Sequence, residues 1–160
     1  MQQAMIQVRD GAAIMHPEAR RGRGAVSNAS GRYEPVRHVT LDDGWGVLDE
    51  PPPPRKTSVM MDATRTIIAR NASPDIPFDR SINAYRGCEH GCIYCFARPT
   101  HAYLGFSPGI DFESRLLAKP DAPALLEKEL RNPNYRPQPI AMGTNTDVYQ
   151  PIEKHYRITR

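Results

Sequence analysis

Three cysteines crowd into one short stretch of this chain and limit how it can fold. The 160-residue sequence has no cysteine other than Cys88, Cys92 and Cys95. An odd, tightly clustered set cannot build a disulfide framework. Free thiols gathered in this way are typical of a reducing compartment, where they bind metal or react. We therefore expect a thiol-bearing loop in a cytoplasmic protein.

The spacing of the three residues is C-x3-C-x2-C. Thiolates are the protein ligands of iron–sulfur clusters, and a cubane normally takes four of them. With three cysteines, one iron stays without a thiolate, and an open metal position is where a cofactor or substrate binds. Gly87 and Gly91 flank the first cysteine, and glycine permits the sharp turns that bring the sulfurs together.

Three alternative interpretations of the cysteines remain open. In the first, they form part of an apolar core, although a glutamate, a histidine and a glycine lie between them. In the second, they bind zinc, with His90 or His101 as a fourth ligand, although no second ligand pair follows at a convincing distance. In the third, Cys92 and Cys95 form a redox pair, which leaves Cys88 without a role.

Residues 1–56 are expected to form a basic, Pro/Gly-rich irregular arm and linker. The run Pro51–Pro54 favours an extended spacer. The basic stretch His16–Gly24 is interpreted as a solvated tail, with phosphate contact as the alternative, and Trp45 is a candidate anchor. The net charge of +3 permits nucleic-acid binding without arguing for it. No apolar run is long enough to cross a bilayer, so we expect no membrane partner.

Residues 57–160 show an alternating pattern of strands and helices. The expected order begins with a strand over Ser81–Tyr85, the cysteine loop and a helix capped by Asp121. A second strand over Pro139–Met142, a polar loop over Gly143–Asp147 and the start of a helix over Pro151–Lys154 follow. A βαβα order predicts parallel strands. Because loops that follow parallel strands gather on one face, the cysteine loop and the Gly143–Asp147 loop are predicted neighbours.

An aromatic residue, Tyr94, directly precedes the last cysteine. With it, the motif resembles the signature of the radical S-adenosylmethionine (radical SAM) superfamily. Further segments are similar to the bacterial group related to spore photoproduct lyase, and they are Arg70–Asp75, Ser81–Gly87, Ala97–Tyr103, Asp111–Glu113 and Gly143–Asp147. Ala84 and Val148 stand where that group has proline, and neither position supplies a metal ligand.

The resemblance implies a fold and a chemistry. The fold would be α/β, the N-terminal part of a partial (β/α)6 TIM-like radical SAM barrel preceded by a largely irregular N-terminal arm. Residues 57–160 would supply about two βα units of a longer protein. Cys88, Cys92 and Cys95 would hold a 4Fe–4S cluster whose fourth iron is chelated by S-adenosylmethionine. Reductive cleavage of this cofactor yields a 5′-deoxyadenosyl radical, which abstracts hydrogen from a substrate.

The resemblance also implies roles for residues around the cluster. Tyr94 would hold the adenine end of the cofactor. Gly143, Thr144, Asn145 and Thr146 would contact its methionine amino group, and their hydroxyl and amide oxygens suit an ammonium. The alternative for this loop is an ordinary polar turn. His90 is expected to orient the cysteine loop and Arg98 to offset the cluster's charge, unless both are surface residues.

Partners and substrate are less constrained. The chemistry implies an electron donor such as flavodoxin or ferredoxin. Kinship with spore photoproduct lyase suggests a nucleic-acid substrate by analogy, and the residues that would abstract hydrogen from it are unknown. The alternative from another class of protein is a zinc-stabilised nucleic-acid-binding module, which would use the basic arm and the cysteine loop.

Overall fold

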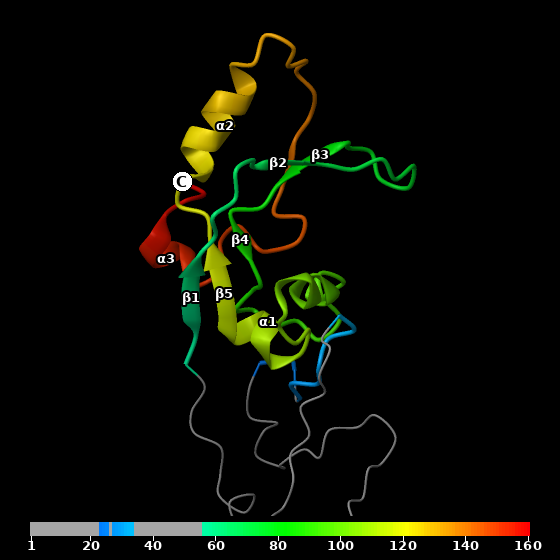
Figure 1. The fold of residues 1–160 in the computed structure, drawn as a ribbon, viewed down its shortest axis with the longest axis vertical. Helices are drawn as coiled ribbons and strands as arrows, with labels where there is room; N and C mark the ends of the chain where they lie inside the picture. The colour runs from blue at the N-terminus through cyan, green and yellow to red at the C-terminus, as the bar shows by residue number, and fades with distance from the viewer. Residues whose placement is uncertain (1–22, 26, 34–55) are drawn as a thin grey trace, which may run out of the picture.

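The computed structural model describes residues 23–25, 27–33 and 56–160 (Figure 1). The predictions for Trp45, for Pro51–Pro54 and for most of the basic stretch lie outside the described residues. Within residues 56–160 the chain is a mixed α/β structure with two three-stranded sheets.

The first sheet has the strand order β1-β5-β4. β1 (Ser58–Met61) runs parallel to β5 (Arg115–Ala118), as Figure 1 shows, and β4 (Tyr85–Arg86) pairs antiparallel with β5. Leu116 and Ala118 of β5 are fully buried. This central strand therefore carries the apolar core of the sheet.

The second sheet has the order β2-β3-β6. β3 (Arg80–Ile82) pairs antiparallel with β2 (Ile68–Arg70) and parallel with β6 (Ala141–Met142). The parallel pairing expected between the first and second predicted strands is confirmed. Both sheets are nonetheless mixed, and the described residues form no barrel.

The single strand predicted over Ser81–Tyr85 is wrong, because the chain changes sheets within it. β3 ends at Ile82 and β4 begins at Tyr85. Between them the side chain of Asn83 bonds to the Gly143–Asp147 loop, and the Ala84 carbonyl accepts the Lys119 N–H. These competing partners draw the two halves of the segment into different sheets. β1 and β5 were not expected from the sequence.

Four helical segments complete the described elements between residues 98 and 156, and they are η3 (Arg98–Leu104), α1 (Ile110–Ser114), α2 (Ala122–Leu130) and α3 (Glu153–Tyr156). α2 follows Asp121 as predicted, although the Asp121 side chain makes no capping hydrogen bond. α3 begins two residues beyond Pro151 and is one turn long. It ends at Tyr156, because the next residue, Arg157, has a left-handed φ of 51° that does not continue a helix.

Three buried clusters form the core. Tyr85, Leu116 and Ile152 belong to the one at the first sheet, and Ile67 and Ile82 belong to the one at the second. The remaining cluster lies beneath the cysteine loop, where Cys88 packs with Ala97 and Phe112. None of the helices in the described part of the chain is long and apolar enough to cross a membrane.

Candidate metal centre and cofactor loop

The cysteine loop is a series of tight turns, and each cysteine starts one of them. The carbonyls of Cys88, Cys92 and Cys95 accept hydrogen bonds from residues three positions ahead, at 3.2, 3.1 and 3.3 Å. Gly87 and Gly91 have φ angles of 76° and 61°, a region that side chains disfavour. The prediction that these two glycines turn the loop is confirmed.

The three thiols differ in exposure. Cys88 is buried, Cys95 is half-buried and Cys92 is exposed, and all three are free. Burial raises the pKa of the Cys88 thiol, while hydrogen bonds from the backbone N–H groups of Asp147 and His90 act in the opposite direction. Cys88 is thus fixed in place, whereas Cys92 lies open to a ligand.

The donor set fits an iron–sulfur cluster in chemistry, with three free thiols in one loop. Among the described residues, however, no three His, Cys, Asp or Glu side chains already lie in a group that can hold a metal. Binding of one metal centre by all three thiols would therefore require Cys92 and Cys95 to move closer to Cys88.

A buried ion pair supports the cysteine loop from within. Arg98 donates from Nη2 to the Gly91 carbonyl at 2.6 Å and from Nε to the Cys92 carbonyl at 2.9 Å. The same Nη2 lies 2.8 Å from the carboxylate of Glu113, and both side chains are buried. The interpretation of Arg98 as a surface residue is therefore wrong. Glu113 was not predicted as a supporting residue, because its neighbours in the sequence give no indication of the buried ion pair with Arg98.

The arm contacts the outside of the cysteine loop. The Gly24 N–H donates to the Gly91 carbonyl at 2.9 Å, and the Ala25 N–H donates to Glu113 at 3.1 Å. Arg23 bonds to the Glu113 carbonyl and pairs with Glu89 at 3.0 Å. Figure 1 draws this segment in blue against the loop. A solvated tail was the expectation here, and for these residues it is wrong.

The two histidines near the loop have different surroundings. His90 is exposed, with Nε2 3.6 Å from a carboxylate oxygen of Asp147. His101 is fully buried, and its Nε2 donates to the Arg115 carbonyl at 2.8 Å. Burial lowers the pKa of His101, which favours the neutral ring. One ring nitrogen of His101 is thus already used in the core.

The polar loop after β6 lies beside the cysteine loop, as predicted, since its Asp147 approaches His90. Its Gly143 N–H donates to the Ile82 carbonyl at 2.9 Å, and Gly143 has a φ of 71°. Thr144 is half-buried and Asn145 is exposed, so both can face a ligand. Thr146 is buried, and its hydroxyl lies 3.5 Å from the Tyr85 carbonyl.

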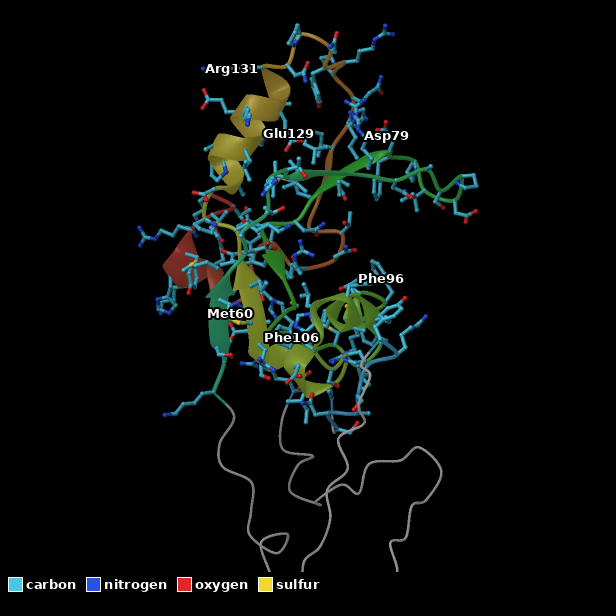
Figure 2. The ribbon with its side chains drawn as sticks, viewed as in Figure 1. Met60, Asp79, Phe96, Phe106, Glu129 and Arg131 are labelled. Atoms are coloured by element: carbon cyan, nitrogen blue, oxygen red, sulfur yellow. The ribbon has the colours of Figure 1, made fainter. Side chains whose placement is uncertain are left out.

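An exposed apolar rim borders the thiols. Tyr94, the predicted adenine contact, is 87% exposed, and Ile93 and Phe96 are also largely exposed. Figure 2 labels Phe96 on the outer side of the loop. The ring of Tyr94 is therefore free to stack on a flat partner.

The fold and the site define a mixed α/β chain that presents three free thiols beside a polar loop. The chain is 51% identical over 83 residues to the uncharacterized protein Rv2578c of Mycobacterium tuberculosis. It is 31% identical over 80 residues to the uncharacterized protein MJ0683 of Methanocaldococcus jannaschii. These matches cover 52% and 49% of this chain, but only 24% and 27% of the relatives. No family model and no solved structure matches.

Proposed function

We propose that this chain binds a 4Fe–4S cluster through Cys88, Cys92 and Cys95 and belongs to a cytoplasmic radical SAM enzyme. The observation that carries the proposal is the placement of three free thiols on successive turns of one loop. When bound, such a cluster supplies the electron that cleaves S-adenosylmethionine reductively. The resemblance of the motif, with its aromatic residue before the last cysteine, supports the same class.

The chain's own residues suit this role. Arg98 holds the loop backbone and Glu113 holds Arg98 in turn, so that a bound group would meet a fixed support. Thr144 and Asn145 present oxygen acceptors of the kind that an ammonium group needs. The exposed ring of Tyr94 offers a face on which adenine can stack.

Partners and substrate belong to the same proposal. An electron donor such as a flavodoxin or a ferredoxin would approach the exposed side chains of Ile93 and Phe96. A nucleic-acid substrate follows only from the likeness to the spore photoproduct lyase group. Because the matched relatives extend far beyond the matched segment, residues of a longer protein would complete the substrate site.

Anaerobic reconstitution with iron and sulfide tests the proposal. We expect about four irons and four sulfides per chain, the content of a single cubane, with a brown colour. Replacing Cys88, Cys92 or Cys95 with alanine should remove most of this iron, because two thiolates hold a cubane poorly.

His90→Ala is the matched control, since it changes the same loop without removing a thiol. This variant should retain the wild-type iron content. Stoichiometric zinc without sulfide in anaerobically purified protein, lost on His90→Ala, would instead favour the zinc-stabilised nucleic-acid-binding module.

A further inference from the structure

Two buried amide side chains connect the cysteine loop to the polar loop. Gln150 is 1% exposed and lies just beyond the polar loop. Its Oε1 accepts the Glu89 N–H at 3.0 Å, and its Nε2 donates to the Gly87 carbonyl at 3.3 Å. These two partners lie on either side of Cys88, so one side chain holds the backbone both before and after that thiol.

Asn83 makes the corresponding connection in the opposite direction. It lies between β3 and β4, ahead of the cysteine loop, and it is buried. Its Oδ1 accepts the Asn145 N–H at 2.8 Å, and its Nδ2 contacts the Thr144 hydroxyl at 3.2 Å. Each loop is thus held by an amide from the segment that adjoins the other.

An amide suits this task because it carries a donor and an acceptor on one planar group. A carboxylate would lack the donor, and an apolar side chain would leave the backbone groups unsatisfied. A buried polar group without a partner is destabilising, because it has lost its hydrogen bond to water and gained none in the protein. Loss of these hydrogen bonds would therefore disturb the buried backbone around Cys88 more than a similar loss would disturb an exposed loop, where water can replace the lost partner.

We propose that Gln150 and Asn83 are positioning residues, which fix Cys88 relative to Thr144 and Asn145. Through them, a ligand that binds the polar loop changes the environment of Cys88, and a metal at Cys88 orders the polar loop. This functional meaning rests on the proposed cluster and cofactor, whereas the positioning itself is testable without either.

Thiol alkylation of the metal-free protein tests the positioning. Iodoacetamide labelling, followed by mass spectrometry of each cysteine peptide, should show fast labelling of exposed Cys92 and slow labelling of buried Cys88. Gln150→Met removes both hydrogen bonds at similar volume and should accelerate labelling of Cys88 about tenfold through local opening. Labelling of Cys92 should change little.

Thr159→Val is the matched control. The Thr159 hydroxyl donates to the Val148 carbonyl at 3.0 Å, so this variant removes a hydrogen bond to the residue that follows the polar loop but none near Cys88. It should leave labelling of Cys88 unchanged. Gln150→Glu is a second variant, to be used if Gln150→Met does not fold. It keeps the acceptor and loses the donor, so its rate of Cys88 labelling should lie between those of the wild type and Gln150→Met. Wild-type labelling of Cys88 in both Gln150 variants would overturn the proposal.

A second readout examines the link between the loops in reconstituted protein. Addition of S-adenosylmethionine should change the electron paramagnetic resonance spectrum of the reduced wild-type and Thr159→Val proteins. In Gln150→Met and Asn83→Leu the iron should be retained, but this change should be weakened. A wild-type protein that takes up no iron would refute the proposed function, while the alkylation result would still decide the positioning role.

Discussion

Single glycines determine whether the cysteine loop can adopt its turns. Gly91 has a φ of 61°, and a Cβ at this position would lie 2.5 Å from a carboxylate oxygen of Glu113 and 2.6 Å from the Cβ of Arg23. Gly105 has a similar φ of 73°, but a Cβ there would meet nothing within 4 Å. The two positions share the same backbone demand and differ only in crowding.

Alanine at these glycines should therefore have unequal effects. Gly105→Ala should lower the free energy of unfolding by about 1–2 kcal/mol, the cost of the left-handed conformation. Gly91→Ala should cost roughly 3 kcal/mol, because Glu113 and Arg23 must also move. Urea unfolding of both variants measures the difference through the transition midpoint. Equal losses would show that the arm and Glu113 do not crowd Gly91.

At this scale, the sequence predicts the features that depend only on neighbouring residues. The thiol spacing and the turning glycines are visible in a short window, and the structure confirms the turns at Gly87 and Gly91. Burial of Arg98 and Glu113 was not visible. It depends on partners such as Ala25, which lies 88 positions from Glu113, and charged residues are otherwise mostly exposed.

At the scale of elements, α2 packs on the second sheet through Ala122, Leu125 and Leu126, and one of its carboxylates adds hydrogen bonds to the sheet. Glu129 accepts the N–H groups of Ile67 and Ile68 at 2.5 and 3.4 Å, which supports the start of β2. Glu127, on the same helix, forms an exposed pair with Arg131 at 2.5 Å. Figure 2 labels Glu129 on the side of α2 toward β2 and Arg131 near the helix end.

The two glutamates should differ in their contribution to stability. Glu129→Ala leaves two backbone donors without their acceptor and should cost about 1.5–3 kcal/mol. Glu127→Ala removes an exposed ion pair and should cost about 0.5 kcal/mol or less. Thermal and urea unfolding check both values, and amide exchange at Ile67 and Ile68 should accelerate only in Glu129→Ala. Similar small losses in both variants would mean that β2 does not depend on this contact.

Elements were predicted unevenly for a physical reason. α2 was predicted because its sequence has a candidate capping residue at Asp121, a first-turn proline at Pro123 and the pair Asn132-Pro133 at its end. β1 (Ser-Val-Met-Met) and β5 (Arg-Leu-Leu-Ala) do not alternate apolar and polar residues, so they lack the period-two pattern that identifies a half-buried strand. The split between β3 and β4 depends on Asn83 meeting a loop some sixty positions later, which no local pattern reveals.

At the scale of the whole molecule, the C-terminal segment links the two sheets. Ile158 packs against the buried clusters of both. Glu153 holds this segment in place, because its carboxylate accepts the N–H groups of Ile158, Thr159 and Arg160 at 3.2, 2.9 and 3.3 Å. It also accepts the buried hydroxyl of Tyr85, whose pKa is raised mainly by burial. The two sheets are thereby expected to unfold as one unit.

Ile158→Ala should test this cooperation. Truncating a half-buried isoleucine that contacts both clusters should lower the free energy of unfolding by roughly 2 kcal/mol. If Ile158 joins the sheets, amide exchange in β3 and in β5 should accelerate by similar factors, as expected for one cooperative unit. Ile76→Ala, which truncates an exposed isoleucine, should cost about 0.5 kcal/mol or less and serves as the control. Faster exchange in one sheet alone would show that the sheets open independently, and Ile158 would then support only the sheet that responded.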